Sequence, residues 1–441
     1  LRGRLDIYDP VGIIGLLGFH FFFLSPLLHV HWDYYIRYVT PPPDWRTWLG
    51  SMAFLNLLGL LIYRLSKSVF AAHRDERPAL TLWRLDGPFF VKKVIPAALL
   101  ITAVAQIFVY RKYGGVLGYM RSYADEEGSF VGMGWTFMIS ESFPILAMMG
   151  YAVFARMKRI RHRWTSLVLL LAAFFIVSMF FGGLRGSRSN TIWNLFWAVG
   201  IVHYWVRPLR KKTIAFGMIF LLLFMYVYGF YKAKGLEGIS NVVGKENGIA
   251  TLEEETGRTK HIILVGDLSR AAIQAFLLYR MFNSDYELAL GRTYLGGLAK
   301  AVPARLWPNR PVTKVKEGTD AQYGMGTYAL GISSSRVYGL AGEAMLNFGP
   351  VAVPQIFVVL GYVVGRLQLL TKSLSPLDAR WLLVPFMIRL CFGVLAGDSD
   401  NIVFSIGKNG LMPILVVLVS STRIPKREPA RSAVPRPVSS A

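Results

Sequence analysis

The sequence predicts an all-α polytopic integral membrane protein with about ten transmembrane helices. Of its 441 residues, 54% are hydrophobic and 17% are charged, whereas soluble proteins carry about 25% charged residues. Many windows hold about 17–25 mostly apolar residues, the length that an α-helix needs to cross a bilayer core of about 30 Å. The alternating apolar and polar ten-residue segments of an outer-membrane barrel are absent from the sequence.

The ten expected spans follow from these apolar windows. They cover approximately residues 11–30, 48–65, 92–110, 133–155, 165–182, 189–206, 213–231, 340–365, 381–397 and 402–421. One alternate set of connections holds twenty-six Lys and Arg, and the short connections of the other set hold eight. Because positive charge is retained on the cytoplasmic side of short loops, the basic set is predicted to be cytoplasmic. The net charge of +23 is then explained by topology, and no nucleic-acid partner is expected.

Four regions are predicted from this topology. Residues 1–231 hold the first seven spans, 232–338 form one large loop on the outer face, 339–421 hold the last three spans, and 422–441 form a basic tail. The tail is rich in Pro, Arg, Ser and Ala, so we expect it to be disordered and cytoplasmic. The chain begins with Leu1, and we expect further spans to precede it.

The large outer loop contains one segment with helical periodicity, residues 261–283. Ile273 and Phe276 belong to its apolar positions, while Arg270 and Arg280 belong to its polar ones. Its hydrophobicity is interrupted, so we predict an interfacial amphipathic helix and not an additional span.

Two arginine-bearing turns are predicted on the outer side. The sequence GGLRGSRSN, residues 182–190, holds Arg185 and Arg188, whose guanidiniums can hold phosphate oxygens through paired N–H donors. The sequence AVPARLWPNRPVTK, residues 301–314, adds Arg310 and Trp307, and the indole ring suits either a sugar surface or the membrane interface. The alternative for the first turn is that its arginines are anchors to lipid head groups. The alternative for the second is a rigid interfacial turn.

The sequence SSSRVYGLAGEAMLNFGP, residues 333–350, leads into the eighth expected span with Arg336, Tyr338 and Glu343. A carboxylate about one turn inside a span is costly unless it is paired or hydrated, which makes Glu343 a functional candidate. Arg336 shares a helical face with Glu343 if the helix begins early. The alternative for this pair is a structural ion pair.

The ninth expected span adds Arg389 at its middle, with Asp398 and Asp400 at its outer end. Arg389 is expected to pair with Glu343 or with a substrate phosphate. The two aspartates resemble half of a metal-binding DxD motif, but the seven histidines show no ligand spacing and Cys391 is the only cysteine. Glycine-rich nucleotide loops are absent from the sequence, so neither a metal nor a cofactor is expected.

Taken in order, GGLRGSRSN, VPARLWPNRP, SSSRVYGLAGEAMLNFG and GVLAGDSDN resemble the bacterial O-antigen and oligosaccharide repeat-unit polymerases, the Wzy family. The enterobacterial common antigen polymerase branch is the closest comparison, and the resemblance covers roughly residues 90–420. It implies a GT-C-like fold in the bacterial inner membrane with a site facing the periplasm. It also implies transfer of a growing glycan from undecaprenyl pyrophosphate to a hydroxyl of an incoming lipid-linked unit, with a chain-length regulator as a further partner.

With this resemblance, the residues receive expected roles. The anionic pyrophosphate leaving group needs preorganised cationic donors, for which the candidates are Arg185, Arg188, Arg310, Arg336 and Arg389. The acceptor hydroxyl needs a base or an orienting carboxylate; Glu343 is the first candidate, followed by Asp398 and Asp400. Trp307, Tyr323 and Tyr338 are candidates for the sugar surface.

Two other functions fit parts of the same pattern. An O-antigen ligase uses the same donor and differs in its acceptor. A flippase for lipid-linked oligosaccharides belongs to another class, and internal repeats and charges in both halves of the membrane are typical of it. The sequence instead concentrates the candidate groups on the outer side.

Overall fold

A computed structural model describes residues 8–36, 39–72, 81–125, 133–186, 188–244, 248–257, 259, 261–302 and 306–425. Within these residues the protein is mostly helical, with one two-stranded antiparallel sheet formed by β1 (Leu82–Leu85) and β2 (Ser421–Ile424). The expected disordered tail therefore begins too early, because residues 422–424 belong to β2 and pair with β1. The remainder of that prediction, residues 426–441, lies outside the described residues.

Among the described residues, seven helices are long and apolar enough to cross a membrane, which makes this a multi-pass membrane protein. They cover Pro10–His31, Trp45–Ala71, Gly87–Lys112, Gly134–Met157, Ala215–Gly235, Ala352–Ser373 and Ser399–Val419. Two shorter apolar helices, Trp164–Phe180 and Val384–Ala396, coincide with the fifth and ninth expected spans. The sixth expected span is helical from Arg188 to Val206 but is not among the seven.

The first half of the chain is built from helices that follow one another closely. They are α1 (Pro10–Phe19), η1 (His20–Leu24), α2 (Ser25–His31), α3 (Trp45–Ala72), α4 (Gly87–Phe89), η2 (Phe90–Val94), α5 (Ile95–Lys112), α6 (Gly115–Asp125), α7 (Gly134–Ser140), α8 (Phe143–Met157), α9 (Trp164–Phe180), η3 (Gly183–Arg185), α10 (Arg188–Ile201), η4 (Val202–Val206) and α11 (Lys211–Gly244). A break at Gly235, with φ of 61°, divides α11 where the predicted outer loop begins.

The second half contains the loop helices and the last spans. They are α12 (Gly248–Thr256), η5 (Ile262–Asp267), α13 (Ala271–Asn283), α14 (Arg292–Ala299), α15 (Lys314–Tyr323), η6 (Thr327–Leu330), α16 (Gly339–Phe348), α17 (Ala352–Ser373), η7 (Ala379–Leu382), α18 (Val384–Ala396), α19 (Ser399–Ser405), η8 (Ile406–Gly410) and α20 (Leu411–Val419). The eighth expected span is divided at Gly349, whose φ is 79°, so α17 is the spanning helix and α16 precedes it. Glu343 therefore lies before the span and not one turn inside it.

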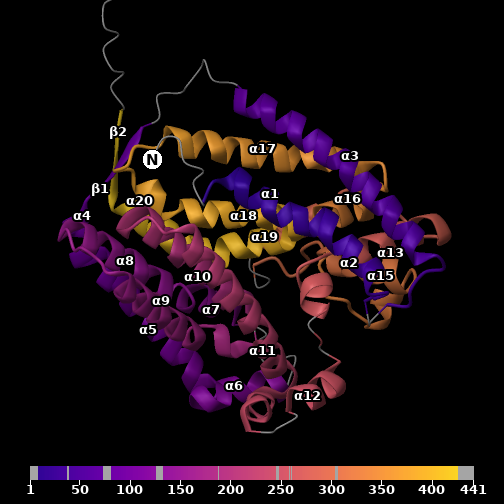
Figure 1. The fold of residues 1–441 in the computed structure, drawn as a ribbon, viewed down its shortest axis with the longest axis horizontal. Helices are drawn as coiled ribbons and strands as arrows, with labels where there is room; N and C mark the ends of the chain where they lie inside the picture. The colour runs from indigo at the N-terminus through magenta and orange to yellow at the C-terminus, as the bar shows by residue number, and fades with distance from the viewer. Residues whose placement is uncertain are drawn as a thin grey trace, which may run out of the picture.

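The basic connections meet at one end of the molecule, here called the basic end and defined by residues 81–86, 156–163, 205–210, 375–380 and 420–424. Backbone pairing joins β1 to β2, and Asp86 N–H donates to the Ser420 carbonyl at 2.9 Å. Arg156 Nη2 donates to the Pro376 carbonyl at 2.9 Å. Figure 1 shows β1, β2 and α4 at this end, and α13, α15 and α16 at the opposite end. The alternation of charge along the sequence thus corresponds to a spatial separation.

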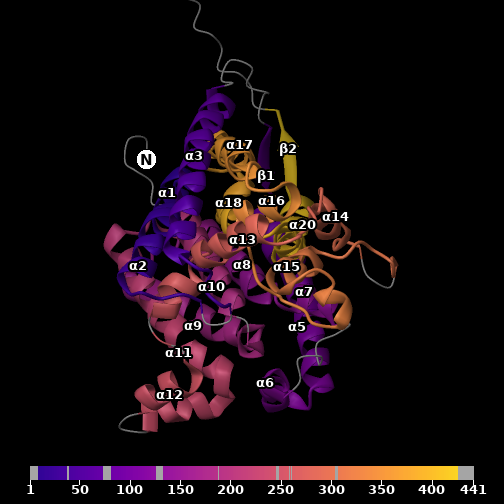
Figure 2. The ribbon, with the colours of Figure 1, turned by 90° about the vertical axis from the view of Figure 1, so that its right-hand side faces the viewer.

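Three groups of buried apolar side chains form the interior of the described residues, and α18 contributes to the two larger ones. One of these two includes Val353 and Phe357 of α17 with Met52 of α3, and the other includes Trp197 of α10. Figures 1 and 2 both show α3 and α17 side by side. Their close approach uses Gly361, where an added Cβ would lie 2.0 Å from Ser66 Oγ.

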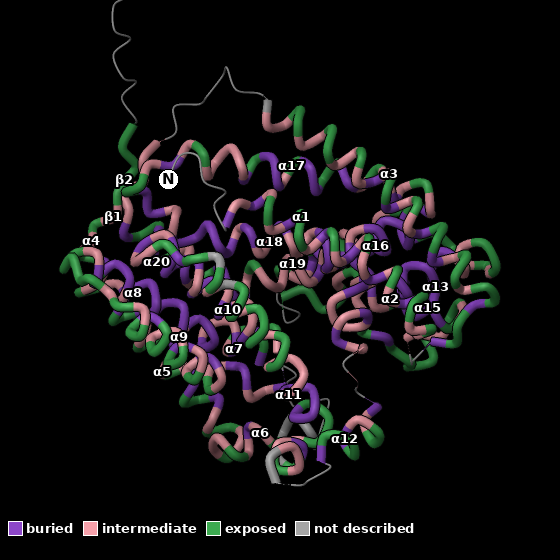
Figure 3. Tube along the Cα trace, viewed as in Figure 1, coloured by how far each residue is buried: buried purple, intermediate pink, exposed green. Residues whose placement is uncertain are grey.

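The outer faces of the spanning helices carry apolar stripes. On α3, the exposed side chains include Phe54, Leu57, Leu61 and Leu65, which recur at helical spacing. Figure 3 shows exposed segments along the outer side of α3 while α18 is largely buried in the interior. Such stripes are expected where the surrounding solvent is lipid.

The outer loop is folded, and its principal helix is in the core. All eight residues from Ala271 to Leu278 of α13 are buried, and Gln274 Nε2 donates to the Tyr338 carbonyl at 2.7 Å. The segment predicted as one interfacial helix, 261–283, is divided at residues 268–270 into η5 and α13. The prediction was wrong because the apolar face of this segment is covered by α3, α15 and α16 instead of by the bilayer surface.

Candidate functional site

Glu343 on α16 is the centre of a buried polar group. Its Oε1 accepts hydrogen bonds from Thr293 Oγ1 at 2.8 Å and Ser399 Oγ at 2.6 Å, and its Oε2 accepts one from Ser399 N–H at 2.6 Å. Its residue surface is 3% exposed. Burial raises the pKa of the Glu343 carboxyl to about 7, and the nearby Asp398 carboxylate adds to this shift. A carboxyl with a pKa near neutrality can accept a proton under physiological conditions.

Asp398 lies beside this carboxyl at the end of α18 and is fully buried. Its Oδ1 accepts backbone N–H groups of Tyr338 at 3.0 Å and Gly339 at 2.8 Å, and Lys314 Nζ pairs with its Oδ2. Burial raises the pKa of Asp398, while the charge of Lys314 opposes that rise. These contacts fix the turn before α16, so Asp398 is held in a structural network.

Asp400 completes the set of three predicted carboxylates. Lys300 Nζ lies 3.2 Å from its Oδ2, and its Oδ1 is buried with no hydrogen-bond partner among the described residues. The three carboxylates are brought together because Ser399, which bonds Glu343, lies between Asp398 and Asp400 at the start of α19.

A cavity of about 360 Å³ has Glu343 in its wall. Its lining comes from α14, α16, α17, α18 and α19 and is otherwise largely apolar: Tyr294, Leu340, Ile356, Val359, Val394, Gly397, Ser399 and Ile402. The Tyr294 hydroxyl is buried and has no hydrogen-bond partner among the described residues. Val359 of the spanning helix α17 is 43% exposed, so the cavity lies next to the lipid-facing surface. A carboxyl and an unpartnered hydroxyl thus line a largely apolar space.

A second buried group of charges involves Glu141, Arg185 and Lys408. Arg185 Nη2 lies 2.6 Å from Glu141 Oε1, and Lys408 Nζ lies 2.6 Å from Glu141 Oε2. Lys408 Nζ also donates to Asn190 Oδ1 at 2.7 Å. The π-helical turn η8 carries Lys408, and single π-turns within helices are frequent at functional sites.

Arg389 joins this group and does not pair with Glu343 as one expectation proposed. It lies over the rings of Trp193 at 5.4 Å and Phe386 at 6.0 Å, and its guanidinium donates to the Asn409 amide oxygen when that amide is oriented to face it. Arg185 and Arg389 are both close enough to Lys408 to repel its charge. Two cations therefore pair with Glu141, and Arg389 lies near one of them, Lys408. We name Arg185, Lys408 and Arg389 the cation group.

The carboxylate site and the cation group are neighbours across one aromatic ring. Lys300 Nζ lies 5.5 Å from the centre of the Phe404 ring, and Lys408 Nζ lies 5.6 Å from the same centre. Lys300 is bonded to Asp400, and Lys408 to Glu141. The two groups are therefore linked through Lys300, Phe404 and Lys408.

Arg188 is separate from the cation group. It forms two bonds to Asp267 of η5, from Nη1 at 2.5 Å and from Nη2 at 3.0 Å. Arg270 follows that turn, donates to the Ser269 carbonyl at 2.7 Å and interacts with the charges of Asp267 and Asp398. This arrangement fastens the large loop to the start of α10, close to the carboxylates.

The remaining predicted residues do not converge. Arg310 Nη1 donates to the Val302 carbonyl at 2.9 Å, and Arg336 precedes α16 instead of sharing a helical face with Glu343. Trp307 and Tyr323 are exposed, as a sugar surface requires. Tyr338 has no exposed surface and its hydroxyl is bonded to Gln322, so it supports the site from inside and cannot stack on a sugar.

Sequence reasoning missed Thr293, Ser399, Tyr294, Glu141 and Lys408. Two of these had a signal, since Glu141 and Lys408 each lie within an apolar window where an ionisable residue is a functional candidate. The other three are ordinary polar residues whose roles depend on tertiary contacts. Among the described residues, no group of three His, Cys, Asp and Glu side chains is arranged to hold a metal ion.

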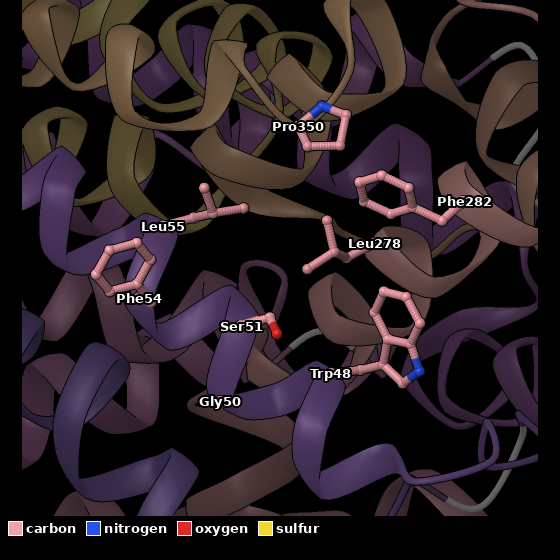
Figure 4. A pocket seen from close by; sticks show the side chains of 8 residues that line it. All are labelled: Trp48, Gly50, Ser51, Phe54, Leu55, Leu278, Phe282 and Pro350. Atoms are coloured by element: carbon pink, nitrogen blue, oxygen red, sulfur yellow. The ribbon is translucent and has the colours of Figure 1, made fainter.

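A second hollow of about 540 Å³ lies between α3 and α13. Figure 4 shows its lining, Trp48, Gly50, Ser51, Phe54, Leu55, Leu278, Phe282 and Pro350, in which Ser51 is the only hydroxyl-bearing side chain. Such a lining suits hydrocarbon.

Comparison with known proteins does not assign the chain to a family, because no protein-family model, no curated protein and no solved structure matches it. The chemistry of the site therefore carries the functional argument.

Proposed function

We propose that this protein is a glycan polymerase that transfers a growing oligosaccharide from undecaprenyl pyrophosphate to a hydroxyl of an incoming lipid-linked repeat unit. The observation that supports it most is the path of contacts from Glu343, a buried carboxyl of near-neutral pKa, through Ser399 at the start of α19 to η8, which carries Lys408 of the cation group. Acceptor activation needs the first and departure of an anionic lipid needs the second.

In the proposed reaction, the acceptor hydroxyl oxygen forms a bond to the anomeric carbon of the donor glycan. The bond from that carbon to the pyrophosphate oxygen breaks, and the hydroxyl proton passes to Glu343. Tyr294, which has an unused hydroxyl in the same cavity, orients the acceptor. Arg185, Lys408 and Arg389 stabilise the charge that develops on the leaving pyrophosphate.

Asp398 and Asp400, the alternative bases, act as positioning residues in this proposal. Both are held by lysines, Lys314 and Lys300, and Asp398 has its acceptors occupied by backbone N–H groups. In this proposal the exposed side chains of Trp307 and Tyr323 contact the glycan. The apolar hollow between α3 and α13 binds the polyprenyl chain.

The proposed function also implies a number of spans and an orientation in the membrane. The helices 164–180, 188–206 and 384–396 added to the seven candidates give ten spans, in a GT-C-like arrangement in the bacterial inner membrane. The basic end then faces the cytoplasm and the site faces the periplasm. A chain-length regulator is a proposed protein partner.

The test is polymerisation in vitro with undecaprenyl-pyrophosphate-linked repeat units, without nucleotide sugar and with EDTA present. We expect a ladder of products from the wild type that is lost in Glu343→Gln and in Lys408→Gln, and kept in Glu237→Gln, an exposed carboxylate of α11. Transfer to a lipid A core without a ladder would indicate a ligase. Movement of units across a liposome membrane without any new glycosidic bond would indicate a flippase and overturn the proposal.

A further inference from the structure

The basic end contains a cluster of arginines stacked on tryptophans, remote from the carboxylate site. The rings of Trp164, at the start of α9, and Trp205, in η4, are covered by guanidiniums from neighbouring turns. Arg207 lies 4.4 Å and Arg210 lies 5.6 Å from the centre of the Trp164 ring, and Arg156 lies 4.6 Å from that of Trp205. Stacking on an aromatic face leaves the N–H edge of a guanidinium free for an anion.

Two of these arginines, Arg207 and Arg156, are held by the protein backbone and not by acidic side chains. Arg207 Nη1 donates to the His162 carbonyl at 2.8 Å, and Arg156 Nη2 donates to the Pro376 carbonyl at 2.9 Å. His162 is itself fixed, since its Nε2 lies 2.8 Å from the Tyr151 hydroxyl. The two turns that meet at Trp164 are therefore preorganised.

Negative charge that would neutralise this cluster is missing. Residues 142–236 contain no Asp or Glu, although residues 156–163 and 207–212 hold nine Lys and Arg. No ion pair involves Arg156, Arg207 or Arg210 in the part of the chain that the structure describes. Two acidic residues belong to the basic end: Asp378 is paired with Arg380 at 2.7 Å, and Asp86 Oδ1 accepts the Phe89 N–H at 3.1 Å. The guanidiniums of the cluster are therefore available to an external anion.

Exposed apolar side chains beside the cluster indicate which kind of anion it would bind. Val168 lies one helical turn after Trp164 on α9 and is exposed, as is Leu169, and Met157 and Ile160 flank the preceding turn with exposed apolar side chains. A phosphate at the guanidiniums would thus continue into hydrocarbon along α9. Tryptophan at the level of the head groups is typical of a membrane interface.

We propose that Arg207, Arg210 and Trp164 form a binding site for the phosphodiester head group of an anionic phospholipid at the basic end. The two guanidiniums hold the phosphate oxygens, and the acyl chains lie along Val168. Retention of positive charge by topology alone requires only cations at this end. It does not require two guanidiniums on one ring without an acidic partner, and basic pockets between spanning helices are known to bind such head groups.

The test measures binding of phosphatidylglycerol and phosphatidylcholine to the full chain, purified in a neutral detergent, by native mass spectrometry and by the shift in thermal unfolding midpoint. We expect phosphatidylglycerol to bind and stabilise the wild type, and phosphatidylcholine to do neither. Arg207→Gln/Arg210→Gln should weaken phosphatidylglycerol binding about tenfold, because two charge-assisted contacts are lost. Arg111→Gln/Lys112→Gln, an equal charge change in the last turn of α5, should leave binding unchanged within about twofold.

The single variant Arg210→Gln keeps the hydrogen bond from Arg207 to the His162 carbonyl. It therefore tests the lipid site even if the double variant does not fold. It should also weaken phosphatidylglycerol binding while leaving the lipid-free unfolding midpoint unchanged. Equal binding by wild type and Arg210→Gln, or equal binding of both lipids, would overturn the proposal. Stabilisation by soluble glycerol phosphate at the same concentration would show a site for free phosphate and would overturn the assignment to a lipid.

Discussion

Ser399 donates two hydrogen bonds to Glu343, one from its backbone N–H to Oε2 and one from its hydroxyl to Oε1, each at 2.6 Å. A single residue at the start of α19 therefore donates hydrogen bonds to both oxygens of a carboxyl on α16. The same turn carries Asp398 and Asp400 on either side. The position of Glu343 is thus tied to the helix that also carries Lys408 in its following π-turn.

The first prediction concerns the proton acceptor. Glu343→Gln should reduce polymerisation at least about 100-fold, because general base catalysis contributes 10²–10⁴-fold and an amide accepts no proton at neutral pH. The substitution should leave the substrate KM within about threefold. The rate of ladder formation on a gel measures this, and Glu237→Gln is the matched control. Retention of more than half of the wild-type rate would exclude Glu343 as the base.

The pH dependence follows from the raised pKa of Glu343. Its proton-accepting form is the carboxylate, so activity should rise as pH increases through about 7. Stability should change in the opposite direction. The folded-state pKa exceeds the unfolded value of about 4.3, so the contribution of this group is complete below that value and is lost as pH rises through about 7.

Initial rates from pH 5.5 to 8.5 and unfolding midpoints over the same range measure both effects. A profile of activity that falls as pH increases through 7 would contradict the assigned role. In Glu343→Gln, the part of the stability slope due to this carboxyl should disappear.

Tyr294 provides a test that separates function from folding. Its hydroxyl has no partner among the described residues, so Tyr294→Phe removes no intramolecular hydrogen bond and should leave the unfolding midpoint unchanged or slightly raised. Loss of the acceptor contact should raise the KM for the acceptor or lower the rate by roughly tenfold. Unchanged kinetics would remove Tyr294 from the site.

Lys408 and Glu141 should behave as a coupled pair. Lys408→Met leaves the Glu141 carboxylate with one cation instead of two and should destabilise the protein by about 3–5 kcal/mol. Lys408→Met/Glu141→Gln should recover most of that stability, because the buried charge is removed with its partner. Activity should remain lost in the double variant, since the cation that faces the pyrophosphate is still absent. Recovery of activity together with stability would assign Lys408 a structural role only.

The contact of α3 with α17 depends on a missing side chain. Gly361→Ala places a Cβ 2.0 Å from Ser66 Oγ and 2.9 Å from Lys67 N, so the two helices must separate. We expect a loss of about 1–3 kcal/mol, as for other overpacked interiors. Gly217→Ala, where an added Cβ meets nothing within 4 Å, is the control and should be neutral or slightly stabilising. Equal unfolding midpoints for the two variants would contradict this account of the packing.

The helical membrane class and the sorting of connections to two ends were determined by the sequence alone. Apolar length and the number of Lys and Arg in each turn are local properties, and they act on the chain before any tertiary contact forms. The gathering of Glu343, Asp398 and Asp400 was also predictable in part, because charged residues that end or precede apolar segments on one side of a membrane share a narrow layer.

Only the tertiary structure decided which charged side chains are paired with other side chains and which line the cavity. Nothing in the sequence of α13 distinguishes a helix on the bilayer surface from a core helix, since both require apolar residues, and the covering by α3, α15 and α16 decided it. The pairing of Lys314 with Asp398, of Arg188 with Asp267 and of Lys408 with Glu141 joins residues distant in the chain. Charges select partners by distance and burial, and these are fixed only when the helices pack.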